Sequence, residues 1–72
     1  MIDKDLTLDL FTTMSSKLAD RPAAEAFENL GAAVGLVALA LEREHGIDRA
    51  ITFKMVQRHG HSAIKEMERS DD

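Results

Sequence analysis

The stretch that decides the fold runs from Leu30 to Leu41 and reads LGAAVGLVALAL. None of its 12 residues carries a charge, and none has a polar side chain. In a helix these residues make every side apolar, and a helix that is apolar all round must be buried on every side. A chain of 72 residues has too little mass to cover such a helix alone. We therefore predict that a second copy of the chain covers it.

The residues on either side extend this stretch into one long helix, predicted over residues 22–45. Asp20 offers a capping carboxylate, and Pro22 follows near the first turn, where its missing N–H costs nothing. Gly46 follows Arg43 and His45 in the last turn, a pattern typical of the C-terminal end of a helix. Residues three and four positions apart in this helix form an apolar seam. We predict an oligomer interface made of the seam and of two leucines opposite it: Phe27, Leu30, Val34, Leu36, Val37, Leu39 and Leu41.

A shorter helix is predicted before it, over about residues 5–19. Apolar residues recur there at helical spacing, and Asp3 or Asp5 can cap the N-terminus. Residues 6–10 also alternate between apolar and polar side chains, which is typical of a strand. That pattern leaves open a ribbon-helix-helix dimer, in which a short strand pairs with its symmetry mate. Asp9 would then face DNA phosphates, which disfavours this alternative.

A further helix is predicted from about residue 48 to 59, with Asp48 as its N-cap. Gly60 either ends this helix, with a restart over about residues 62–69, or the helix continues through it. The sequence thus predicts an all-α fold of three helices, or four if Gly60 is a break. We expect a single domain over residues 1–72 that assembles as a dimeric helical bundle.

The composition excludes several classes of protein. The chain has no cysteine, so a disulfide scaffold, a thiolate zinc site and cysteine catalysis are all excluded. Chains under about 70–80 residues rarely gain more than about 3–5 kcal/mol from one core, and they usually add disulfides, a metal or a partner chain. Because disulfides are excluded, the composition also favours an oligomer.

The charge of the chain is unevenly distributed. Residues 1–48 carry a net charge of −5, while residues 49–65 carry four basic side chains and no acidic one. The candidate anion- or partner-binding residues in this basic band are Arg49, Lys54 and Arg58. The band is typical either of a binding surface or of a solvated helix face beside an acidic neighbour. The formal net charge of −4 disfavours nucleic acid as the partner.

Few residues here suggest chemistry. Glu42 and His45 form an E-x-x-H pair on one helical face, as in di-iron bundles. Charged residues are common in the last turn of a helix, so we predict no metal and keep this pair as an alternative. His59 and His61 diverge if the helix runs through Gly60. Because the chain has no nucleophile elbow and no phosphate-binding glycine loop, we predict no enzyme and no cofactor.

These expectations combine into one predicted function. The chain is a non-enzymatic cytoplasmic homo-oligomer, a homodimer or a higher even oligomer, that acts by binding another protein as a regulator, adaptor or inhibitor. The 12-residue apolar run is too short to span a bilayer, so we expect no membrane partner. One alternative is a helix-turn-helix-like DNA-binding transcriptional regulator, with the turn at Gly46 and a basic helix after it. The second alternative is a metal-binding bundle that uses Glu42 and His45.

Overall fold

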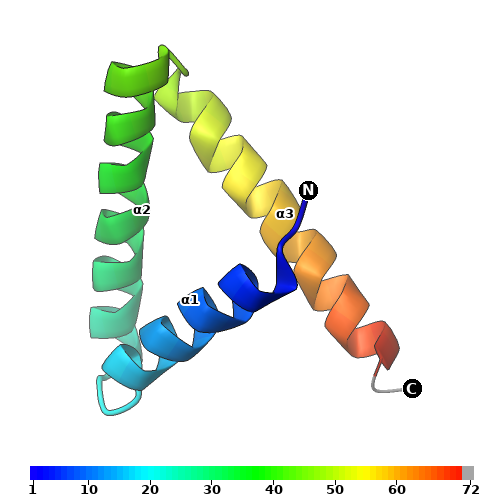
Figure 1. Ribbon diagram of the computed structural model, residues 1–72. Helices are drawn as coiled ribbons and strands as arrows, with labels where there is room; N and C mark the ends of the chain where they lie inside the picture. Colours follow the sequence, from blue (N-terminus) through cyan, green and yellow to red (C-terminus); the bar gives the residue numbers. More distant parts are fainter. Residues whose placement is uncertain (71–72) are drawn as a thin grey trace. The chain divides into compact units, whose positions relative to one another are not determined.

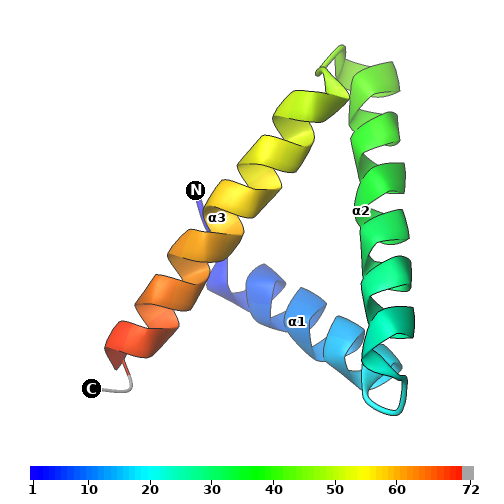
Figure 2. The same ribbon diagram turned by 180° about the vertical axis from the view of Figure 1, so that it is seen from behind.

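The computed structural model describes residues 1–70, which form three helices. These are α1 (Lys4–Leu18), α2 (Ala23–His45) and α3 (Arg49–Ser70) (Figures 1 and 2). No strand occurs in residues 1–70. The prediction of an all-α chain with three helices is confirmed. The strand alternative is wrong, because residues 6–10 lie inside α1.

The N-terminus of α1 is fixed by Asp3. Its side chain accepts a hydrogen bond from the backbone N–H of Leu6 at 3.1 Å, and its carbonyl accepts one from Thr7 at 2.9 Å. Asp3 is therefore the N-cap. Asp5, the other predicted cap, lies in the first turn, where the helix dipole stabilises a carboxylate.

The two ends of α2 differ in how closely they follow the prediction. The carbonyl of Pro22 accepts the first helical hydrogen bond, from Ala26 at 3.0 Å, so Pro22 rather than Asp20 is the N-cap residue. At the other end, Gly46 has φ +69°, and its N–H bonds to the carbonyl of Glu42 at 3.0 Å. This left-handed glycine is the helix stop that the sequence predicts.

The third helix is continuous. The Asp48 side chain accepts a hydrogen bond from Ala50 N–H at 2.8 Å and caps the helix as predicted. The helix then runs for 22 residues, through Gly60, to Ser70. The four-helix alternative, with a break at Gly60, is therefore wrong. At 1.5 Å per residue α3 is about 33 Å long.

The chain divides into two compact units, Met1–Leu30 and Gly31–Asp72. The first unit holds α1 and the beginning of α2, and the second holds the rest of α2 and all of α3. Among residues 1–70 only Ala38, 1% exposed, and Thr52, 6% exposed, are buried, and both belong to the second unit. Almost all of the large apolar side chains are exposed or half-buried.

Candidate interaction surfaces

The predicted interface residues of α2 are mostly accessible. In the second unit, Leu36 is 68% exposed and Val37 is 56% exposed, while Val34, Leu39 and Leu41 are half-buried. In the first unit, the remaining two residues of the set are both exposed, at 72% and 41%: Phe27 and Leu30. A continuous apolar surface of α2 is therefore left uncovered within each unit.

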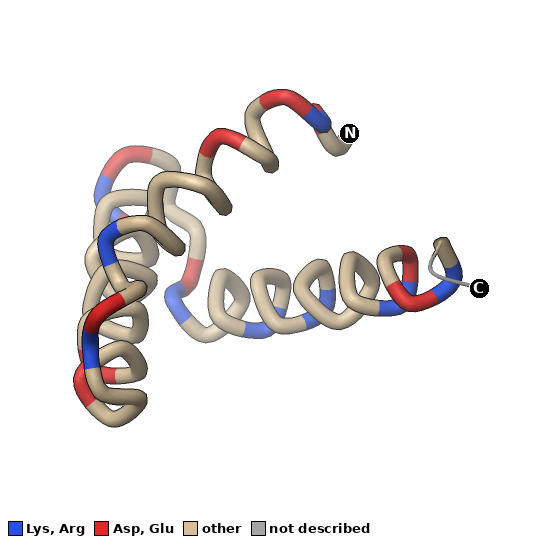
Figure 3. Tube along the Cα trace, turned by 90° about the horizontal axis from the view of Figure 1, so that it is seen from below, with Lys and Arg blue, Asp and Glu red and all other residues tan. Residues whose placement is uncertain are grey.

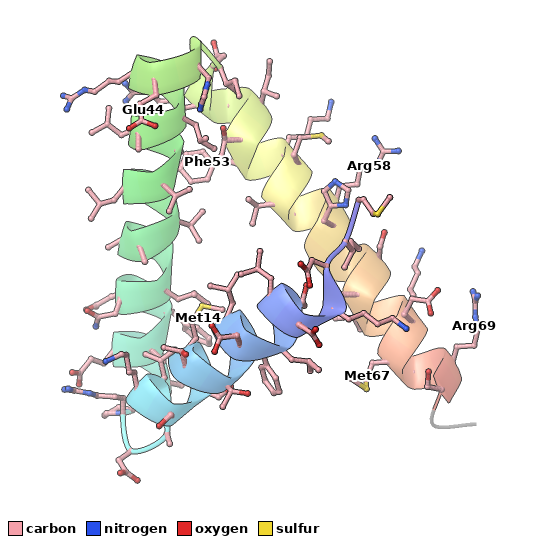
Figure 4. All side chains as sticks on the ribbon, viewed as in Figure 1. Met14, Glu44, Phe53, Arg58, Met67 and Arg69 are labelled. Atoms are coloured by element: carbon pink, nitrogen blue, oxygen red, sulfur yellow. The ribbon has the colours of Figure 1, made fainter. Side chains whose placement is uncertain are left out.

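The covered line on α2 differs from the predicted seam. On the part of α2 in the second unit the buried residue is Ala38, and Val34 and Leu41 on the same side of the helix are half-buried. Val37, a member of the predicted seam, is exposed. Small side chains let helices approach closely, which explains why Ala38 is the buried position. In Figure 4 the ring of Phe53, from α3, extends toward α2.

The corner between α2 and α3 is held by one ion pair across the loop. Arg49 donates to Glu42 from its guanidinium, with Nη2–Oε1 at 2.7 Å and Nε–Oε2 at 3.1 Å. The backbone N–H of Arg49 also donates to Oε2 of Glu42, at 3.2 Å. This two-pronged geometry is the strongest form of an arginine–carboxylate pair. The pair binds the end of α2 to the first residue of α3.

This pair takes up two residues that the sequence assigns to different sites. Both carboxylate oxygens of Glu42, the candidate metal ligand, accept from Arg49. Arg49, a candidate for anion binding, is in turn neutralised by Glu42. Residues 1–70 contain no group of three or more His, Cys, Asp or Glu side chains that could hold a metal ion. The structure therefore brings Glu42 to Arg49 and not into a ligand set with His45.

The ion pair makes the stability of the corner depend on pH. Hydrogen bonds from the Arg49 side chain and backbone hold the pKa of Glu42 below its ordinary value of 4.5, and Glu42 raises the pKa of Arg49. A lowered carboxyl pKa in the folded state adds stability above the unfolded pKa, and this stability is lost as the pH falls through the folded pKa.

We expect Glu42→Gln to lower the free energy of unfolding at neutral pH, because the charge-assisted bonds to Arg49 are lost. The difference from the wild type should shrink as the pH falls below 4.5 and Glu42 becomes protonated. Urea unfolding at one protein concentration over a series of pH values measures it. Glu44→Gln, which changes a neighbouring exposed carboxylate outside any ion pair of residues 1–70, is the control. A difference that does not vary with pH would contradict this assignment.

The second buried residue, Thr52, has an unsatisfied hydroxyl. Its Oγ1 has no hydrogen-bond partner in residues 1–70, although its backbone N–H bonds to Asp48 at 3.2 Å. A buried polar group without a partner costs about 1–3 kcal/mol. The site is a local weakness of the contact between α2 and α3.

Thr52→Val should therefore stabilise the chain by about 1 kcal/mol, because it replaces the unpaired hydroxyl by a methyl group of similar shape. Chemical denaturation at constant protein concentration measures the change. Thr12→Val, at an exposed position of α1, is the control and should stay within about 0.5 kcal/mol of the wild type. Destabilisation by Thr52→Val would mean that the hydroxyl is bonded in solution.

The exposed side of α3 carries a row of basic residues. Their spacing of four, three, four and four residues places them on one face of the helix. We call this row the basic stripe of α3: Lys54, Arg58, His61, Lys65 and Arg69. All five are exposed, and none forms an ion pair within residues 1–70. Figure 3 shows the lysines and arginines following one edge of α3.

Sequence reasoning found only part of this stripe. It includes Lys54 and Arg58 among the candidate residues and counts Lys65 in the same basic band, but the uncertainty at Gly60 left these residues and Arg69 without a common helical register. Once the helix is continuous through Gly60, all of them share one register. The stripe could have been found from the spacing of the basic residues on both sides of Gly60, because that spacing is helical throughout.

One helix within residues 1–70, α2, is long and apolar enough to cross a membrane by length and composition. Its 18-residue window has a mean hydropathy of 1.4, and 6% of that window is buried within the chain. Its uncharged run from Asn29 to Leu41 covers about 20 Å at 1.5 Å per residue. The hydrocarbon core of a bilayer is about 30 Å thick. The uncharged run is therefore shorter than this core.

Comparison of the chain with protein families, with curated proteins and with solved structures finds no match.

Proposed function

We propose that this chain is a small, non-enzymatic, cytoplasmic helical protein that forms a homodimer through α2 and acts by binding another macromolecule. The observation that carries the proposal is the exposure of the apolar surface of α2, above all of Leu36 at 68%. A large apolar side chain gains about 1.5–3 kcal/mol when it is fully buried. Contiguous exposed apolar residues are typical of protein interfaces.

The geometry of the second unit explains why α3 does not cover this surface. Leu36 precedes the buried Ala38 by two positions. At 3.6 residues per turn, this places the two side chains about 160° apart around the helix. The helix that packs on Ala38 is thus on the far side from Leu36. Leu39, half-buried, lies between these two directions. A protein segment that packs on Leu36 therefore has to approach α2 from outside this unit.

A second copy is the occupant that we propose for this surface. The same side chains then meet across a two-fold axis, as is usual in homodimers. The short apolar run of α2 argues against lipid, and chains of about 72 residues without disulfides usually add a metal or a partner chain. Dimerisation also leaves the polar surfaces of the chain free for a further partner.

Neither alternative from the sequence gains support. The helix-turn-helix alternative uses Arg49 on its reading helix, and Arg49 is bound to Glu42 through its side chain and its backbone. The metal alternative uses the carboxylate of Glu42, both oxygens of which already accept hydrogen bonds. We therefore carry neither further.

The direct test is the mass of the wild-type chain in solution. Sedimentation equilibrium at micromolar concentration should give twice the chain mass of 8.0 kDa, with dissociation on dilution. A mass of one chain over the whole concentration range would overturn the proposal. The variant that locates the interface is argued in the Discussion.

A further inference from the structure

The basic stripe of α3 is a surface that the proposed function leaves unused. The net charge of −4 disfavours nucleic acid as a partner of the chain as a whole, but nine of its 13 acidic residues lie in residues 1–48, outside this helix. We propose that the stripe, which is locally basic, binds the phosphate backbone of duplex nucleic acid without reading the base sequence. The inference concerns one face of one helix, so it goes beyond the proposed dimer and holds for a single chain as well.

The stripe has the dimensions of a backbone contact. Its first and last residues, Lys54 and Arg69, are 15 positions apart, or about 22 Å along the helix. Neighbouring members follow at about 4.5–6 Å along the axis. Duplex DNA carries one negative charge per about 1.7 Å of its axis. A row of cations of this length therefore faces a dense series of phosphates along one groove edge.

The charges of the stripe are free to act on a partner. Arg49, the other cation of α3 outside the stripe, is neutralised by Glu42 at 2.7 Å. The lysines and arginines of the stripe form no ion pair within residues 1–70. Two acidic residues lie near its C-terminal end, Glu66 and Glu68. The four lysines and arginines of the stripe therefore outnumber the acidic residues of α3 by two.

A lipid surface would use both faces of α3, whereas a nucleic acid backbone would use the charged face alone. In Figure 4 Arg58 and Arg69 extend to one side of α3, whereas Met67 extends to the other. Met67, 62% exposed, lies with the exposed Val56 and Ile64 on an apolar face of α3. A membrane-surface helix would insert this apolar face and hold the stripe at the level of the anionic headgroups. A phosphate backbone needs only the charged face and leaves the apolar face to protein contacts.

An acidic protein surface is also a poorer match. The cores of protein interfaces are depleted in charged residues, and their binding energy concentrates in buried aromatic, arginine and apolar anchors. The stripe has no apolar side chain within its own row. Contacts to nucleic acid backbones, in contrast, are made largely by lysine and arginine without such anchors.

The test is salt-dependent binding to a mixed-sequence DNA duplex of about 20 base pairs, two helical turns, followed by fluorescence anisotropy. Four phosphate contacts predict a slope of about −3.6 in log K against log salt. Removing two contacts in Lys54→Gln/Lys65→Gln should reduce the magnitude of the slope by about 1.8. Lys54→Arg/Lys65→Arg should retain it, and far-ultraviolet circular dichroism confirms that each variant is folded.

The matched control is Lys4→Gln/Lys17→Gln, which removes the same charge from α1. It should leave the slope unchanged, and an equal loss in both double variants would overturn the proposal in favour of bulk charge. No duplex binding at about 50 mM salt would also overturn it. The proposal would also be overturned if the chain bound vesicles containing phosphatidylserine more tightly than the duplex. The same holds if poly-glutamate displaced the labelled duplex as well as unlabelled duplex does. Because Leu36 lies outside the stripe, Leu36→Glu should keep the slope, which separates this test from that of the dimer.

Discussion

Leu36→Glu is expected to convert the dimer into single chains of 8.0 kDa. Leu36 is 68% exposed and lies on the side of α2 away from Ala38, so the substitution does not disturb the contact with α3. Two copies of the side chain become buried in the dimer, and each loses about 1.5–3 kcal/mol of apolar burial. The combined loss of about 3–6 kcal/mol weakens the dimer at least about a hundredfold. Placing two carboxylates in an apolar interface adds to this effect.

The matched control for this variant is Leu6→Glu. Leu6 is 56% exposed and lies on α1, outside the proposed interface. Sedimentation equilibrium at equal concentrations compares both variants with the wild type. Leu6→Glu should remain a dimer. A Leu36→Glu chain that keeps the dimeric mass would move the interface away from this face of α2.

Gly46→Ala and Gly60→Ala are expected to change stability in opposite directions. Gly46 has φ +69°, where an L-residue costs about 1–2 kcal/mol. Gly60 lies inside α3, and a Cβ built there meets no atom within 4 Å. Alanine gains about 0.8–1.0 kcal/mol over glycine at such a helical position. The same chemical change therefore separates the two variants by about 2–3 kcal/mol.

Thermal unfolding at a fixed protein concentration measures this difference, because the stability of a dimer depends on concentration. For a domain of this size about 1 kcal/mol corresponds to about 4–8 °C in Tm. Gly46→Ala should lower Tm and Gly60→Ala should raise it. If Gly60→Ala lowered Tm instead, the continuous course of α3 through this glycine would be contradicted. Gly60→Ala also leaves every residue of the basic stripe in place.

Most of the secondary structure could be predicted from local signals. Asp48 and Gly46 mark the beginning of α3 and the end of α2, as expected. The alternatives that proved wrong arose where two local signals compete. Alternating residues suggested a strand over residues 6–10, but Asp3 caps a helix through them. A glycine suggested a break at Gly60, but α3 continues through it.

The candidate sites could be predicted less well. Glu42 and Arg49 both drew attention as charged residues, one for a metal and one for an anion. They are seven positions apart, and only the turn between α2 and α3 brings them to 2.7 Å. No helical periodicity pairs residues at that separation across a loop. The basic stripe, in contrast, lies within one helix and could be read from spacing once the helix was known to be continuous.

The amino-acid sequence by itself determined three helices, most of their ends, and a middle helix too apolar for this chain to cover. These features depend on neighbours within a few residues, through caps, propensities and the helical repeat. Only the tertiary structure decided that Ala38 rather than Val37 is buried and that Arg49 binds Glu42. Both depend on the direction in which α3 leaves the loop at Gly46. That direction is set by packing between helices, which a one-dimensional pattern does not contain.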